Sequence, residues 1–204
     1  MWRDYFLINA EKEAIMNYLT FIVILSCLIT AQVVQGQTEP KNTLSKIEEA
    51  MSAAPSSISE NATILDYPTE PGGQNIVLRK GASGWTCRPD NPHIPGYNPM
   101  CVDSQVFELL SAAAEKRDPN ITQTGFGYFL QGGHGRSNLN PWDNSPTQDN
   151  EWMEPQVPHI VLVSPDKSIL EGLPTKMDNG GPWVMWKNTP YAHIMIPVPK
   201  NTTE

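Results

Sequence analysis

The sequence is poor in positive charge: 14 lysines and arginines stand against 22 aspartates and glutamates, which gives a net charge of −8 at pH 7. A protein that binds nucleic acid neutralises phosphates with clustered basic side chains, and no such cluster occurs here. Adsorption to an anionic membrane surface also requires basic residues. We therefore expect neither nucleic acid nor a membrane surface as a partner.

Several motifs of enzymes and cofactor sites are also missing. The chain contains no P-loop (GxxxxGKS or GxxxxGKT), no dinucleotide fingerprint (GxGxxG) and no zinc-protease motif (HExxH). The segment Gly81-Ala82-Ser83-Gly84 is not the GxSxG turn of a serine nucleophile. We accordingly expect no cofactor, and motifs alone assign no activity.

An uncharged apolar run covers residues 18–34 and is followed by a polar segment. Such a run followed by small residues is typical of a secretory signal peptide, so we predict a signal peptide over residues 1–36 and cleavage after Gly36. Met16 is an alternative start to Met1. The run is also close to the shortest helix that spans a bilayer, so an uncleaved anchor over residues 18–34 is the alternative. We expect a periplasmic or extracellular location, without membrane contact once the signal segment is removed.

Cysteine is scarce, with three in the chain, and two of them lie outside the signal segment. Cys87 and Cys101 are an even pair in an exported chain, which predicts a disulfide bond. Closing a loop of this size stabilises a domain by roughly 3 kcal/mol in the chain-entropy model. Four prolines lie between the two cysteines. We therefore expect a stiff loop that joins a strand to the helix after Asp103.

Hydrophobic periodicity predicts an α+β domain, mainly an antiparallel sheet packed with one principal helix and held by one intrachain disulfide. The principal helix is expected over residues 104–117, because an apolar stripe begins after Asp103 and Pro119 prevents continuation. A shorter helix is expected over 41–54 and a helical turn over 168–173, with strands at 62–67, 75–80, 84–87, 122–131, 159–163, 183–186 and 192–198. The expected organisation is an N-terminal helix and connector (37–61), a single domain (62–199) and a tail (200–204). Residues 137–155 are expected to form a long irregular loop.

Two histidines open predicted strands in similar contexts, Pro158-His159-Ile160 and Ala192-His193-Ile194. If the two strands were neighbours, the imidazoles could converge at one end of the sheet. With a carboxylate from residues 143–154 they could bind a divalent metal or act as acid and base. The alternative is that each is a hydrogen-bonded histidine at the margin of the core.

Residues 132–136 (GGHGR) follow a predicted strand and could form a nest of amides around an anion, with Arg136 adding charge. The alternative is a simple turn with His134 exposed. Trp142 lies in the long loop and is a candidate aromatic contact for a ligand. Trp183 and Trp186 are three apart in a predicted strand, so we expect one in the core and the other facing a groove or solvent.

Five segments carry a resemblance, listed here: Gly84-Trp85-Thr86-Cys87, Asn98-Pro99-Met100-Cys101, Leu130-Gln131-Gly132-Gly133, Pro158-His159-Ile160 and residues 180–198. They resemble a group of exported, mostly bacterial hypothetical proteins with no established activity. The resemblance covers roughly residues 50–198 and implies export in a bacterial setting. It carries no catalytic residue over.

The leading hypothesis is a non-enzymatic exported domain that binds a small ligand or a protein partner through residues 132–155. The candidate binding residues are His134, Arg136, Trp142, His159 and His193. The alternative is a hydrolase, metal-assisted or using a histidine and a carboxylate, with His159 and His193 as the functional residues.

Overall fold

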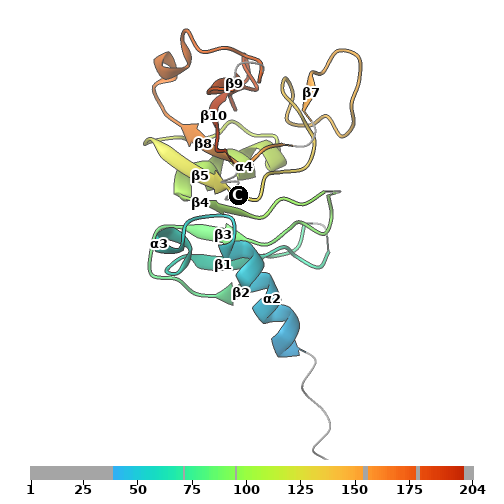
Figure 1. Cartoon of the computed structure of the whole chain (residues 1–204), viewed down its shortest axis with the longest axis vertical. Helices are drawn as coiled ribbons and strands as arrows, with labels where there is room; N and C mark the ends of the chain where they lie inside the picture. The colour runs from blue at the N-terminus through green and yellow to red at the C-terminus, as the bar shows by residue number, and fades with distance from the viewer. Residues whose placement is uncertain (1–38, 71, 95, 154–155, 178–179, 200–204) are drawn as a thin grey trace, which may run out of the picture. The chain divides into compact units, whose positions relative to one another are not determined.

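The computed structural model describes residues 39–204 except 71, 95, 154–155, 178–179 and 200–204 (Figure 1). Met1–Asn42 and Thr43–Glu204 are separate units, and the description below concerns the second. The predicted signal peptide, its alternative as an anchor and the predicted tail lie outside the described residues. Within the described part of the chain, no helix is long and apolar enough to cross a membrane.

An eight-stranded sheet forms the centre of the domain, in the order β2-β1-β3-β4-β5-β8-β10-β9 (Figure 1). All neighbouring pairs are antiparallel except β1 and β3, which are parallel. The strands are β1 (Thr63–Asp66), β2 (Ile76–Arg79), β3 (Thr86–Arg88), β4 (Met100–Val102), β5 (Gly125–Phe129), β8 (His159–Val163), β9 (Trp183–Met185) and β10 (His193–Pro197). The predicted α+β fold with a mainly antiparallel sheet is therefore confirmed.

Two regions form strands that were not predicted from the sequence. Residues 137–155 were expected to be irregular, but β6 (Arg136–Ser137) and β7 (Trp152–Met153) form a short hairpin at the ends of this segment. Strand β4 lies within the proline-rich stretch that was expected to be a loop. Both pairings are made over only two or three residues, which is too short for a periodicity of two to be visible.

The helices are α2 (Glu39–Met51), α3 (Ser56–Ser59), α4 (Ser104–Glu115) and the 3-10 turn η2 (Lys167–Leu170). Helix α4 begins as predicted, because the Asp103 carboxylate accepts hydrogen bonds from the amides of Gln105 and Val106. It ends before the predicted Arg117, because Lys116 adopts the left-handed conformation (φ 56°) and its amide donates to the carbonyls of Ala112 and Ala113.

The two faces of the sheet bury separate hydrophobic clusters, and the neighbouring residues Cys101 and Val102 on β4 belong to different ones. Val102 lies in the cluster beneath α4, which includes Val106 and Leu109 of that helix. Cys101 lies in the cluster on the opposite face, with Ile64 of β1 and the end of α2. Helix α4 therefore covers one face of the sheet, and this face carries the cavity described below.

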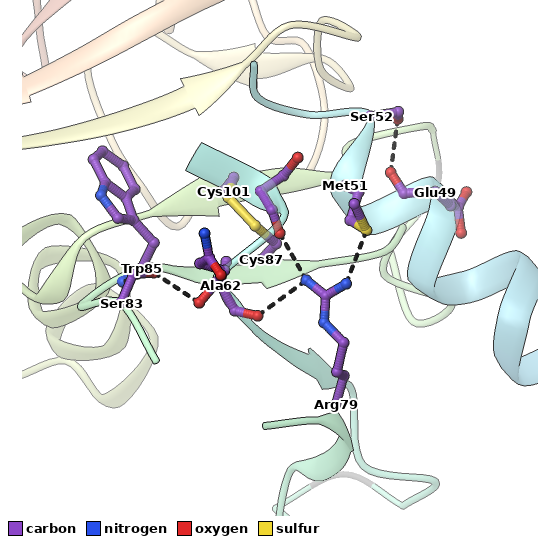
Figure 2. Close-up of a disulfide and its surroundings, with 11 residues drawn as sticks. Glu49, Met51, Ser52, Ala62, Arg79, Ser83, Trp85, Cys87 and Cys101 are labelled. Atoms are coloured by element: carbon purple, nitrogen blue, oxygen red, sulfur yellow. Dashed lines mark hydrogen bonds between the residues drawn. A yellow bond between two sulfur atoms is a disulfide. The ribbon is translucent and has the colours of Figure 1, made fainter. Parts of the chain in front are cut away.

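Cys87 on β3 and Cys101 on β4 lie directly opposite each other and form the predicted disulfide (Figure 2). The bond is fully buried in the cluster on the face away from α4. Nearby, the Arg79 guanidinium donates to the carbonyls of Ser59 and Ala62 at 2.7 and 3.1 Å, which ties β2 to the segment after α3 (Figure 2). The bond fastens β3 to β4, and α4 starts directly after β4.

Candidate functional site: a cavity between helix α4 and the sheet

A cavity of about 310 Å³ lies between α4 and the sheet face that this helix covers. The helix contributes Phe107 and Leu110, and the sheet contributes side chains from β5, β8, β9 and β10. The apolar part of the wall consists of Ile94, Met100, Phe107, Leu110, Ala114, Phe129, Val161, Met185, Trp186 and Met195. A cavity of this size with a mainly apolar wall and a few polar groups is typical of a site for a small organic molecule.

His159 and His193 both line this cavity. The prediction that they converge at one end of the sheet is wrong, because β8 and β10 are antiparallel and their first residues lie at opposite ends of the paired segment. Met195 and Val161 are register partners, however, and each histidine lies two residues before one of them. Alternation along a strand therefore places both imidazoles on the face covered by α4.

The protonation of these two histidines follows from their hydrogen bonds. Nδ1 of His159 lies 2.7 Å from the carbonyl oxygen of Val157, and Nδ1 of His193 lies 2.9 Å from that of Tyr191. A carbonyl only accepts, so we assign the proton to Nδ1 in both rings, which leaves Nε2 with its lone pair. Burial lowers the pKa of each imidazole to about 4, and for His193 the neighbouring His159 and Lys167 lower the pKa further. Both rings are neutral at pH 7.

His134 also lines the cavity, and the expectation that it is exposed is wrong: its exposed fraction is 9%. The loop around Gly96 packs directly onto it, since a Cβ atom at Gly96 would lie 2.3 Å from the Cβ of His134. Burial, and then the charge of Arg136, lower the pKa of His134 to about 4. Gly132 and Gly133 do not contribute to a nest of free amides, because their amides donate to the carbonyls of Phe129 and Gln156.

Two arginines supply the positive charge of the cavity wall. Arg88 donates from Nη2 to Oδ1 of Asn75 at 2.6 Å, and its guanidinium lies 3.7 Å above the centre of the Tyr67 ring. Among the described residues, Arg136 donates only to the carbonyl of Pro141, at a long 3.4 Å. Burial lowers the pKa of both guanidinium groups, but an arginine stays protonated in a protein.

Neither arginine has an ion pair among the described residues. The carboxylates of this region are engaged elsewhere. Glu115, which lines the cavity, pairs with Arg117 at 2.6 Å, and Asp90 accepts a hydrogen bond from the amide of Asn98. The cavity therefore carries a net positive charge in a chain whose net charge is −8.

Three buried side-chain atoms lack a hydrogen-bond partner in the described part of the chain: Nε of Arg88, Oδ1 of Asn98 and Nε2 of His134. All three residues line this one cavity. Buried polar atoms without partners are rare in folded proteins and indicate a functional role or a bound molecule. Their concentration in one wall makes this cavity the candidate site.

A metal site is not supported by this geometry. No group of three or more His, Cys, Asp or Glu side chains in the described ranges is arranged to bind a metal ion. Of the expected carboxylate ligands, Asp143 accepts a hydrogen bond from Asn140, and Glu151 lies 3.6 Å from Nζ of Lys176. Neither lines the cavity, and Glu154 lies outside the described residues.

The tryptophans are placed differently from one another. Trp142 does not line the cavity: its indole donates to the carbonyl of Ala113 at 2.8 Å and packs edge-on against Tyr191 on the outer side of the domain. Trp183 and Trp186 are both buried, so neither faces solvent. Trp186 contributes to the cavity wall; it lies just beyond β9, where its positive φ of 55° breaks the alternation assumed from the sequence.

Four of the five candidate binding residues therefore come together in one cavity: His134, Arg136, His159 and His193. Sequence reasoning missed Arg88, Tyr67 and Asn98. Arg88 had a usable signal, because it follows the buried Cys87 in a strand and alternation places it on the opposite face, the one that α4 covers. Tyr67 and Asn98 reach the cavity from loops and had no such signal.

A second, larger cavity of about 780 Å³ adjoins the first and shares His134 and Gln156 with it. It is lined mainly by glycine, proline and valine, and its wall among the described residues contains no Lys, Arg, Asp or Glu. Among the described residues, the charged side chains are therefore confined to the smaller cavity. Comparisons with known protein families, with curated proteins and with solved structures found no match for this chain.

Proposed function

We propose that this protein is an exported domain that binds a small organic molecule in the cavity between α4 and the sheet. The observation that carries the proposal is that Arg88, Asn98 and His134 each hold a buried polar atom without a partner in the part of the chain that the structure describes, and all three line this cavity. Beside them runs a continuous apolar wall. The combination of an apolar wall with a few convergent polar groups is what small-molecule sites have in common.

The proposed export is supported by the disulfide between Cys87 and Cys101, because such bonds persist in oxidising compartments outside the cytoplasm. The test is to express the full chain with its own N-terminus and sequence the N-terminus of the protein recovered outside the cytoplasm. Gln37 as the first residue supports a cleaved signal peptide. A membrane-bound chain that keeps residues 18–34 supports the anchor instead, and a protein retained in the cytoplasm contradicts export.

Ligand binding is tested with a cavity-filling variant and a matched control on the same helix. Ser111 lines the cavity, whereas Ser104 is exposed at the start of α4 and does not. Native mass spectrometry and a thermal-shift screen of small metabolites are carried out on the wild type, Ser111→Phe and Ser104→Phe. We expect a ligand that binds the wild type and Ser104→Phe but not Ser111→Phe. A ligand that binds all three proteins equally lies outside the cavity and contradicts the proposal.

A hydrolase remains the second candidate, because His159 and His193 each hold the proton on Nδ1 and keep Nε2 as a base within one cavity. Metal analysis of the purified domain separates its metal-assisted form from simple binding. A stoichiometric transition metal that is lost on changing His159 or His193 to Ala would replace the binding proposal. Recovery of the bound ligand in chemically unchanged form after prolonged incubation argues against a metal-free hydrolase.

A further inference from the structure

The two arginines of the cavity wall lie near Tyr67. Arg88 stacks on the Tyr67 ring, and the positive charges of Arg88 and Arg136 both lower the pKa of the Tyr67 phenol against the larger effect of burial, so both guanidinium groups lie near this one side chain. Arg136 in turn acts on His134, which places that residue at the same end. Two guanidinium groups, a phenol and an imidazole thus form one polar cluster.

This cluster has more hydrogen-bond donors than the protein uses. A guanidinium has five N–H donors. Arg136 uses one of them, at 3.4 Å, and the Nε–H of Arg88 is buried without an acceptor. A half-buried cation with neither a counter-ion nor full hydrogen bonding is costly to a fold unless a ligand supplies what the protein does not.

The acidic side chains around the cluster do not supply the missing charge. Asp66, which acts on both Tyr67 and Arg88, is bound to Lys46. Asp90 accepts from the amide of Asn98, and Glu115 pairs with Arg117 at the surface. Among the described residues no carboxylate forms an ion pair with either arginine, so their free donors are available to an external anion.

The remainder of the cavity is unsuited to an anion. His159 and His193 are neutral and present Nε2 lone pairs, which repel negative charge, and His159 is stacked on Phe129. The sulfur and indole side chains of Met185, Met195 and Trp186 complete this end. The two ends therefore favour different parts of one ligand.

From this geometry, and resting on the function proposed above, we infer that the ligand is a small organic carboxylate. Its carboxylate binds Arg88 and Arg136, and its apolar body contacts Met185, Met195 and Trp186. A planar carboxylate matches the paired N–H donors of a guanidinium, which makes this pairing stronger than a neutral hydrogen bond. The volume of about 310 Å³ restricts the body to a few carbon atoms or a single ring.

The test uses matched pairs of probes with the same apolar body, in which a neutral amide replaces the carboxylate: benzoate with benzamide, and hexanoate with hexanamide. Inorganic phosphate serves as an anion that has no apolar body. Binding is measured by calorimetry on the wild type, Arg136→Met, Arg88→Met and Arg136→Lys. We expect at least one carboxylate to bind the wild type about tenfold more tightly than its amide and than phosphate. We expect both methionine variants to lose this preference and Arg136→Lys to retain part of it.

Folding is followed separately, so that a lost preference is not mistaken for a lost fold. Removing a half-buried charge that has no ion-pair partner among the described residues is expected to leave the melting temperature of Arg136→Met equal to or above that of the wild type. Equal affinity for carboxylates and amides, or a preference that survives in both methionine variants, overturns the inference. A neutral ligand that binds the wild type but not Ser111→Phe overturns it while the proposed function stands. Absence of any ligand from the screen and the probe series overturns both.

Discussion

The imidazole of His159 is stacked on the ring of its register partner Phe129, with ring centroids 4.8 Å apart and planes inclined by only 8°. Its Nδ1 is held by the carbonyl of Val157, and its exposed fraction is 2%. A second proton would give this ring a positive charge, and burial keeps away the water that would solvate the charge. The same holds for His193, whose ring lies edge-on against Trp186.

The first prediction concerns pH. The pKa values of His134, His159 and His193 fall from 6.5 to about 4, so between these values the unfolded chain binds more protons than the folded one. The free energy of unfolding is therefore highest above pH 6.5, and the contribution of these histidines is lost as the pH falls from 6.5 towards 4. One such histidine contributes on the order of 3 kcal/mol, and contributions from the mutually repelling His159 and His193 do not add fully. Urea unfolding at pH 7.5, 5.5 and 4.5 measures the effect.

The control for this prediction is His93, which is exposed at the tip of the proline-rich loop. We expect His93→Gln to retain the wild-type dependence on pH and His159→Gln to weaken it, because a neutral amide has no proton to gain. A wild-type protein whose unfolding free energy is the same at pH 7.5 and pH 5 would contradict the assignment of buried neutral histidines.

Whether a feature could be predicted from the sequence depends on how far apart its interacting residues lie along the chain. Strands β8 and β10 could be predicted because each is a run of five consecutive residues that are mostly apolar. The Asp103 cap could be predicted because its partners are two and three residues away. The burial of His134 could not, because it depends on Gly96, 38 positions away in a different loop. A glycine-rich turn considered alone favours exposure, and only the tertiary contact overrides it.

The cavity itself was also beyond the reach of local patterns. Its wall combines the segment after β1, the β3–β4 hairpin, α4 and five further strands, so no single stretch carries its signature. The histidines were singled out for their place at the start of strands, which holds in the structure. The positions of the two histidines relative to each other depend on β8 and β10 being antiparallel neighbours, which only the structure shows.

The second prediction concerns the contact between Gly96 and His134. Gly96 has φ 106°, which L side chains rarely adopt, and a Cβ atom there would lie 2.3 Å from the Cβ of His134. We expect Gly96→Ala to lower the free energy of unfolding by about 2 kcal/mol and to weaken ligand binding, because the loop must move away from the cavity wall. Chemical denaturation and the calorimetric assay measure the two effects.

Gly84→Ala is the matched control for this change, because a Cβ atom at Gly84 meets nothing within 4 Å. It is expected to alter the free energy of unfolding by no more than about 0.5 kcal/mol and to leave binding unchanged. Equal effects of the two substitutions would show that Gly96 does not act through its contact with His134.

The third prediction concerns the disulfide. Cys87 and Cys101 are fully buried and separated by 14 positions, so the bond restricts the unfolded chain by closing a loop of this length. We expect the double variant Cys87→Ser, Cys101→Ser to lose about 3 kcal/mol of unfolding free energy. Dithiothreitol should lower the stability of the wild type by a similar amount and have no further effect on the double variant. A large effect of the reductant on the double variant would point to another thiol-dependent interaction.

The fourth prediction concerns Asp103, which positions α4, the helix that covers the cavity. Its Oδ1 accepts from the amides of Gln105 and Val106 at 2.9 and 3.0 Å, and its Oδ2 accepts from the amide of Phe126 at 2.7 Å. One carboxylate thus caps α4 and fastens it to β5. We expect Asp103→Ala to lower the free energy of unfolding by about 2 kcal/mol, the upper end for a helix cap, because the contact with β5 is lost as well.

Asp103→Asn separates the two functions of this carboxylate, because the amide keeps one acceptor oxygen for the helix but presents N–H donors where Phe126 also donates. We expect an intermediate loss of stability for Asp103→Asn and no more than about 0.5 kcal/mol for Asp118→Ala, an exposed aspartate just beyond the same helix. Urea unfolding at pH 7.5 gives the three values. If Asp103→Asn were as stable as the wild type, the bond to β5 would contribute nothing, and the position of α4 over the cavity would depend on apolar packing alone.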